Sequence, residues 1–169
     1  IVGCGSDGIG PSQAEQRIQL FDGDGQVALV GSALETALKV KVTDMSSGAP
    51  LPGVAVRWVV SVGQGALLNP ASSATDAQGL AQTMLVLGSE AGAYRATAST
   101  DGASGLVSFG ATAVEPLSVT AASSTDVAAG GTVELSGTGF DPVANLTVEF
   151  SGIPGTVTSS SSTSLVVEV

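Results

Sequence analysis

Apolar and polar residues alternate along several short segments of this chain, and this period of two limits the possible folds more than any other feature. The clearest segments are LKVKVT (38–43), VAVRWVV (54–60), AYRATAS (93–99) and LVSFGATA (106–113). Because side chains on a strand point to opposite faces in turn, each segment predicts a strand with one buried face. Turns rich in Gly and Asp separate the segments. The sequence therefore predicts an all-β chain built as a β-sandwich.

The alternation also assigns side chains to the core. Trp58 falls on the apolar face of its segment, Phe109 on the apolar face of 106–113, and Tyr94 near the start of 93–99. We expect Trp58, Tyr94 and Phe109 to be structural core residues. The pattern also places Ile18 and Leu20 together on an inner face, and it places Lys39, Lys41 and Thr43 on an outer face.

A second series of strands begins near Pro116, which interrupts the pattern. We predict three regions: a flexible tether over 1–16, rich in Gly and Ser, then β-domains over 17–114 and 115–169. The strand signals in the second domain are TVELSGTGF, LTVEF and SLVVEV. The expected architecture is two tandem immunoglobulin-like (Ig-like) β-sandwiches, the second incomplete.

The charges exclude some functions. The net charge is −10, and no basic residue follows Arg95. Such a chain repels phosphate backbones, so we expect no nucleic-acid partner. The chain has no His, which removes the Ser-His-Asp arrangement and the commonest zinc ligand. Asp22 and Asp24 in DGDG fit a turn better than a calcium loop. We expect no catalytic residues, no metal, no cofactor and no small-molecule substrate.

The first domain resembles the bacterial Ig-like domains of the invasin/intimin type. The resemblance lies in GDGQ (23–26), GSALETALKVKVTD, PLPGVAVRWVVSVGQGAL, TDAQGLAQTMLVLGSEAGAYRATAS and VSFGATA, which cover about 17–113 in order. It implies a β-sandwich of the kind found in bacterial outer-surface adhesins and other envelope proteins. Trp58 and Tyr94 match the buried tryptophan and the tyrosine corner of such sandwiches.

The second domain resembles an IPT/TIG Ig-like domain. GGTVELSGTGF (130–140), VEFSG (148–152) and SLVVEV carry this resemblance, which covers only 116–169. Domains of this type are longer, so the resemblance implies that the terminal strands are missing. A sandwich that lacks a strand exposes an unpaired edge, which is either a pairing hazard or a binding site.

The single cysteine, Cys4, follows Ile-Val-Gly and precedes Gly-Ser. The stretch resembles the end of a lipoprotein signal peptide, which implies cleavage before Cys4 and lipidation of its thiol. The alternative is a free or intermolecular thiol in a flexible tail. Lipid chains contribute about 0.8 kcal/mol per buried CH₂, so several chains anchor a protein stably.

Together these features predict a non-enzymatic lipoprotein of the bacterial cell envelope, at the outer membrane or cell surface. Its Ig-like domains would act as a spacer, scaffold or adhesin that meets a protein partner. Two alternatives remain: an accessory subunit of a larger envelope or filament assembly, and the stalk of a longer secreted enzyme.

Overall fold

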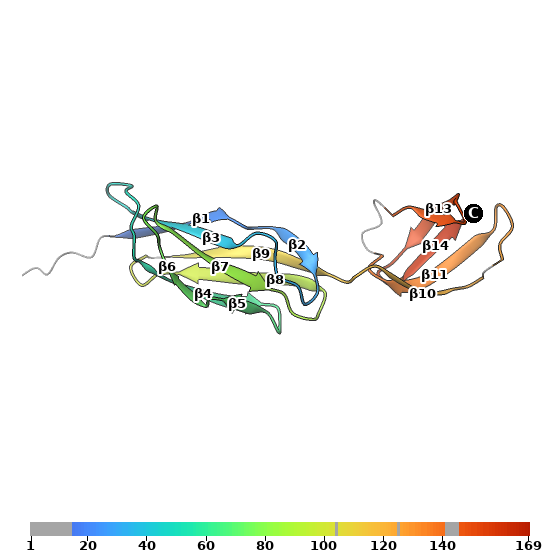
Figure 1. Ribbon diagram of the computed structural model, residues 1–169, viewed down its shortest axis with the longest axis horizontal. Coiled ribbons are helices and arrows are strands. Elements are labelled where there is room, and N and C mark those ends of the chain that lie inside the picture. Colours follow the sequence, from blue (N-terminus) through green and yellow to red (C-terminus); the bar gives the residue numbers. More distant parts are fainter. Residues whose placement is uncertain (1–14, 104, 125, 141–145) are drawn as a thin grey trace, which may run out of the picture. The chain divides into compact units, whose positions relative to one another are not determined.

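The computed structural model describes residues 15–103, 105–124, 126–140 and 146–169, and all their regular elements are β-strands (Figure 1). This confirms the all-β prediction. In these residues no helix exists that is long and apolar enough to cross a membrane. The chain divides into two compact units, Ile1–Ala113 and Val114–Val169.

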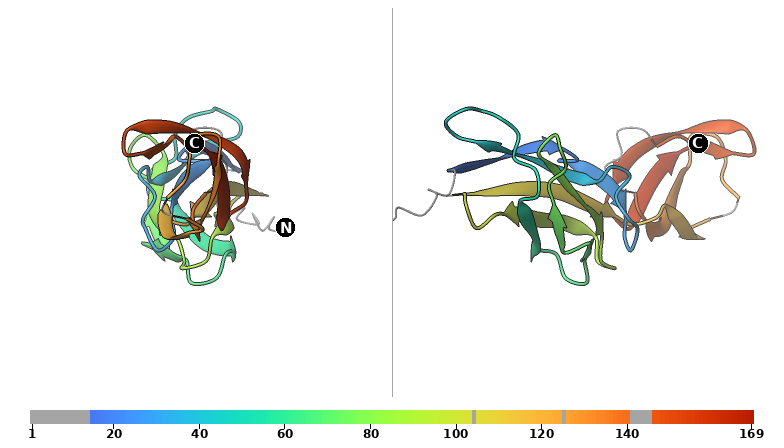
Figure 2. Two further views of the ribbon diagram at one scale, coloured as in Figure 1. Left: turned by 90° about the vertical axis from the view of Figure 1, so that its right-hand side faces the viewer. Right: turned by 60° about the vertical axis from the view of Figure 1, so that its left-hand side comes forward.

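The first unit is a sandwich of two sheets, seen from further sides in Figure 2. The four-stranded sheet has the order β1-β3-β7-β5, and the five-stranded sheet has the order β2-β9-β8-β4-β6. The strands are β1 (Gln16–Asp22), β2 (Gln26–Leu29), β3 (Leu38–Asp44), β4 (Ala55–Val62), β5 (Leu67–Asn69), β6 (Ser72–Ala74), β7 (Leu80–Val86), β8 (Gly92–Ser99) and β9 (Leu106–Val114).

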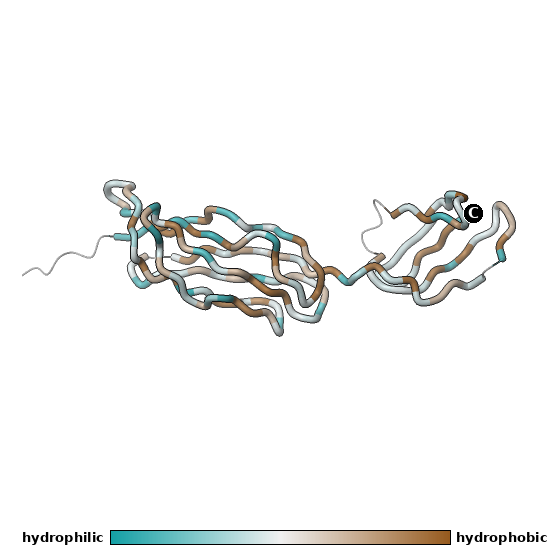
Figure 3. Tube along the Cα trace, viewed as in Figure 1, coloured by the Kyte–Doolittle hydropathy of each residue, from teal (hydrophilic) through white to brown (hydrophobic). Residues whose placement is uncertain are grey.

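The inner faces of the two sheets form one apolar core. From the four-stranded sheet, Leu38, Val40 and Val42 of β3 are fully buried. Val56 of β4 and Ala96 of β8 are equally buried in the opposite sheet. Hydropathy alternates along these strands, as the tube in Figure 3 shows. The alternation in the sequence thus reports burial between two sheets, because every second side chain points inward.

The chain changes sheets along both sides of this sandwich. On one side β1 pairs with β3, and the chain then crosses to β2, which pairs with β9. On the other side β5 pairs with β7, and the chain crosses through the cis Asn69–Pro70 bond to β6, which pairs with β4. These crossings determine which stretches of strand edge are covered.

Two side chains differ from the alternation. Leu20 was predicted to face inward with Ile18, but it is 43% exposed. It lies on an edge strand whose register shifts after Leu20, where the chain turns towards the other sheet. Thr43 was predicted to face outward, but it is only 9% exposed. The following loop folds back over it, and Thr43 forms a bridge with Pro50.

The second unit contains five strands in one hydrogen-bonded series, β10-β11-β14-β13-β12. Its core is small and includes Val133, Leu135, Phe140, Leu165 and Val167. The strands are β10 (Ser118–Ala122), β11 (Thr132–Thr138), β12 (Val148–Phe150), β13 (Ile153–Ser160) and β14 (Ser164–Glu168).

Candidate functional site

The three aromatic residues chosen from the sequence lie inside the first unit. Trp58 is 2% exposed, Phe109 1% and Tyr94 4%. The ring centroids of Trp58 and Phe109 are 5.9 Å apart, with a tilted geometry that is favourable for aromatic pairs. The indole N–H of Trp58 donates to the hydroxyl of Ser73 at 2.9 Å. These side chains stabilise the sandwich and are not accessible to a ligand.

Tyr94 forms a tyrosine corner. Its hydroxyl donates to the backbone carbonyl of Glu90, four residues upstream, at 2.8 Å. Its ring packs so closely on Gly63 that a Cβ built there would lie 2.0 Å from the ring carbon Cδ1. The corner fixes the start of β8 against the loop that follows β4.

The candidate metal ligands have other roles. Asp24 accepts a hydrogen bond from the backbone N–H of Gly110 at 2.7 Å, and Asp22 lies 3.4 Å from the ammonium of Lys39. Within the described ranges, no group of three or more His, Cys, Asp or Glu side chains could hold a metal ion. Cys4 lies outside the described residues, so its lipidation stays a prediction.

Among the described residues, Asp44 is the acidic group whose pKa is shifted most clearly. The hydroxyl of Ser46, then the backbone N–H and the hydroxyl of Ser47, donate to its carboxylate and lower its pKa to about 2. These bonds close the turn after β3. The arrangement is that of a turn in which a carboxylate caps nearby donors, so it is structural.

The outer face of the five-stranded sheet is the surface most suited to binding a partner. We call it the Arg57–Arg95 face. The residues whose side chains point outward from the sheet are Val27, Leu29, Ala55, Arg57, Val59, Val62, Ser72, Ala74, Ala93, Arg95, Thr97, Ser99, Leu106, Ser108 and Thr112, and Gly110 leaves a gap among them. None of these residues is acidic, although the chain contains 15 Asp and Glu residues. Asp24 lies at the edge of the face, beside Gly110.

The two cations on this face have no carboxylate partner. In the described part of the chain the one ion pair within 4.0 Å is Lys39–Asp22, on the other sheet. Arg57 lies opposite Ser99 and Arg95 opposite Val62, so both guanidinium groups stand among small or apolar neighbours. Arginine is enriched in protein interfaces, whereas Asp, Glu and Lys are depleted there.

The remainder of the face is flat and partly apolar. Val59 and Leu106 are 42% and 63% exposed. The hydroxyl of Ser61 donates to the carbonyl of Arg95 at 3.2 Å, and that of Thr97 to the carbonyl of Val59 at 3.4 Å. These side chains therefore lie against the sheet. A flat surface of short side chains loses little conformational entropy when a partner covers it.

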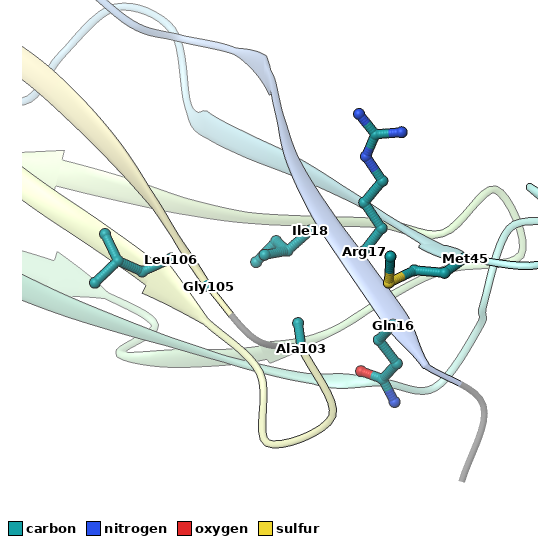
Figure 4. A pocket seen from close by; sticks show the side chains of 7 residues that line it. All are labelled: Gln16, Arg17, Ile18, Met45, Ala103, Gly105 and Leu106. Carbon is teal, nitrogen blue, oxygen red and sulfur yellow. The ribbon is translucent and has the colours of Figure 1, made fainter. Parts of the chain in front are cut away.

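A separate hollow of about 230 Å³ lies beside this face, between β1 and the start of β9 (Figure 4). Its lining includes Ile18, Met45 and Leu106, and Arg17 is the one charged residue in the lining. Figure 4 shows Ile18 between the ribbons of the two strands. The hollow contains no acid–base pair, and its lining combines these apolar side chains with polar groups such as those of Gln16 and Arg17.

The sequence analysis missed the Arg57–Arg95 face, although the sequence contains a signal for it. The outward positions of 54–60, 93–99 and 106–113 hold only apolar, hydroxyl, Gly and Arg residues. Reading the polar positions of these segments for charge, as well as the apolar positions for burial, would have found the face. Their assembly into one sheet could not be read from the pattern.

Comparison with solved structures identifies the fold. A C-terminal 282-residue fragment of intimin, solved in complex with the intimin-binding domain of translocated intimin receptor, matches 70% of this chain at 17% identity and a TM-score of 0.50. The Yersinia pseudotuberculosis adhesin InvE matches 89% at 11% identity, also with a TM-score of 0.50. The chain has the Ig-like fold of these adhesins.

The Ig-like match concerns parts of longer chains. The chain spans 44% of the intimin fragment and 46% of InvE. The D0-D1 domains of intimin match 90% of this chain and 83% of their own length, at 16% identity and a TM-score of 0.46. No family model matches the sequence, and no curated protein matches it.

Proposed function

We propose that the chain is a non-enzymatic part of a bacterial cell-surface protein, in which the first Ig-like unit docks a protein partner through the Arg57–Arg95 face. The observation that carries this proposal is the absence of acidic residues from that face in a chain of net charge −10. The outer face of the four-stranded sheet is also poor in acidic residues, but its Lys39 lies 3.4 Å from Asp22, whereas in the described part of the chain no carboxylate lies within 4.0 Å of Arg57 or Arg95. The likeness in fold to intimin and InvE supports an adhesive or structural role at the cell surface.

The expected partner surface is acidic and flat. Arg57 and Arg95 would act as the charged anchors, and Val59 and Leu106 would supply apolar contact area. A few residues of this kind commonly supply most of the binding energy of an interface. The surrounding hydroxyl groups would exclude water without adding bulk.

A bead-adhesion assay tests the docking role. Beads coated with the purified chain are incubated with bacterial and epithelial cells, and bound beads are counted. The test variant is Arg57→Glu with Arg95→Glu. The matched control is Lys39→Glu with Lys41→Glu, because it makes the same change in net charge on the outer face of the other sheet.

We expect adhesion to fall at least tenfold for the arginine variant and less than threefold for the lysine variant. An equal loss for both variants would show that net charge alone drives adhesion, and the docking proposal would then be wrong. Unfolding curves followed by the fluorescence of Trp58 confirm that both variants are folded.

We also propose that Cys4 carries the lipid anchor of this surface protein. The resemblance of the first residues to a lipoprotein signal supports this. Growth of a bacterium that expresses the complete gene with an alkyne-labelled fatty acid should label the protein, and Cys4→Ser should abolish the label. A mature protein with an unmodified thiol at Cys4 would refute the anchor.

A further inference from the structure

The first half of β9 has one open edge. On one side β9 pairs with β8, from Leu106 opposite Ser99 to Ala113 opposite Gly92. On the other side β2 runs beside only the second half of β9, and the contact begins where the N–H of Gly25 donates to the carbonyl of Gly110 at 2.9 Å (Figure 1). The edge is open because β1 stays with β3 before the chain crosses to β2.

The backbone groups on this open edge belong to Leu106 and Ser108. Both backbone groups of Gly110 point away from β8, since its N–H donates to Asp24 and its carbonyl accepts from Gly25. Backbone direction alternates along a strand, and β9 pairs with β8 without a register shift. The N–H and carbonyl groups of Leu106 and Ser108 therefore point the same way as those of Gly110. In the described ranges no strand pairs with them, and the open stretch is bounded by the bridge of Gln16 with Ala103 at one end and by the bonds of Gly110 to Asp24 and Gly25 at the other.

The hollow beside Ile18 adjoins this edge. Leu106 contributes to both, and Ile18 and Met45 form the opposite part of the lining. The lining contains Arg17 and no carboxylate, and the outer face of β9 has none either. Carboxylates lie beyond both ends of the open stretch: Glu15 and Asp101 line a neighbouring depression past the far end of the hollow, and Asp24 accepts a hydrogen bond from the N–H of Gly110.

We propose that the open edge of β9 binds an extended peptide segment of a partner protein, in which apolar and acidic residues alternate. The segment adds a strand to the five-stranded sheet and bonds to the backbone of Leu106 and Ser108. Its apolar side chains enter the hollow beside Ile18. Its acidic side chains lie on the side of the Arg57–Arg95 face, with Arg95 of the neighbouring β8 and Arg17 of the hollow as the cations and with Asp24 at the Gly110 end of the edge. This inference rests on the proposed docking function and specifies the class of partner.

The test uses a synthetic peptide, TVEVEVT, acetylated and amidated at its ends, titrated into the ¹⁵N-labelled chain up to millimolar concentration. We expect chemical-shift changes centred on the amides of Leu106 and Ser108. Two control peptides have Lys in place of Glu, or N-methyl groups on both the central Val and the Glu that follows it, so that one methyl group faces β9 in either strand direction. The Lys peptide should bind at least threefold more weakly, and the N-methylated peptide should cause no change at these amides.

A substitution in the protein tests the same contact. Ser108→Pro removes an N–H that faces the open edge, and proline is tolerated at such edge positions. We expect this variant to lose at least tenfold in peptide affinity, whereas Ser108→Ala, which keeps the N–H, should bind like the wild type. Trp58 fluorescence during unfolding shows whether Ser108→Pro is folded; if it is not, the peptide controls decide alone.

Two results would overturn the inference: no shift at Leu106 and Ser108 at millimolar peptide, or equal binding by folded Ser108→Pro. The adhesion assay separates this inference from the proposed function. If Arg57→Glu with Arg95→Glu abolishes adhesion but folded Ser108→Pro does not, the face docks a partner without strand addition. If the peptide binds but coated beads do not adhere, the docking function is wrong and the open edge is still a strand-binding site.

Discussion

The contact between Gly63 and Tyr94 should be among the positions of the first unit most sensitive to a single added methyl group. Gly63 has φ of +101°, and a Cβ on it would lie 2.0 Å from Cδ1 and 2.4 Å from Cε1 of Tyr94. The ring of Tyr94 is buried and its hydroxyl is bonded to Glu90. In Gly63→Ala the ring must therefore move, and the tyrosine corner must break.

The expected loss combines three effects. A left-handed backbone costs an L residue about 1–2 kcal/mol, overpacking of a core costs roughly 1–3 kcal/mol, and the lost hydrogen bond adds about 1 kcal/mol. Gly63→Ala should thus lower the free energy of unfolding by roughly 3–6 kcal/mol, out of about 5–15 kcal/mol for a typical domain. This loss is large enough to unfold a marginal domain.

Urea unfolding followed by Trp58 fluorescence measures this loss, because Trp58 is the single tryptophan and lies in the same core. The matched control is Gly92→Ala, which has φ of +135° but no atom within 4 Å of the added Cβ. It should lose only the backbone cost, about 1–2 kcal/mol. Equal losses for Gly63→Ala and Gly92→Ala would refute the reasoning, since the contact with Tyr94 would then contribute nothing.

Three further predictions concern a turn, a buried hydrogen bond and the open edge. The pKa of Asp44 is lowered from 3.8 to about 2 in the folded chain, so its stabilising effect is complete above the unfolded value and disappears as the pH falls through about 2. Asp44→Asn should therefore lose less stability than the wild type as the pH falls between these values. Acid unfolding curves of the two proteins measure this difference, and parallel curves would contradict the lowered pKa of Asp44. Ser73→Ala removes the acceptor of the buried Trp58 indole N–H and should lower the free energy of unfolding by about 1–3 kcal/mol, with a shift in the emission maximum; an unchanged urea midpoint would argue against this bond. In hydrogen exchange monitored by NMR, the amide of Ser108 should exchange at least tenfold faster than that of Val107, which faces β8, and similar protection would mean that the edge is covered.

The strands of this chain and most of their inner faces could be predicted from the sequence alone. A strand that is buried on one face must alternate, so residues such as Val40 and Phe109 are recognisable as core without knowing what packs against them. Tyr94 could be singled out in the same way. These predictions depend on each segment by itself, and they were wrong only where a loop or a crossing overrides the segment, at Thr43 and Leu20.

Only the tertiary structure decided which strands lie side by side, and the candidate site depends on that arrangement. Arg57 and Arg95 belong to segments more than thirty residues apart, and they share a face because β4 pairs with β8. The open edge at Ser108 exists because the chain leaves β1 for β2 too late to cover the start of β9. Backbone groups at an edge carry no residue-specific signal, so no sequence pattern marks them. The sequence determined what each strand buries, and the pairing of the sheets determined what the molecule leaves exposed to a partner.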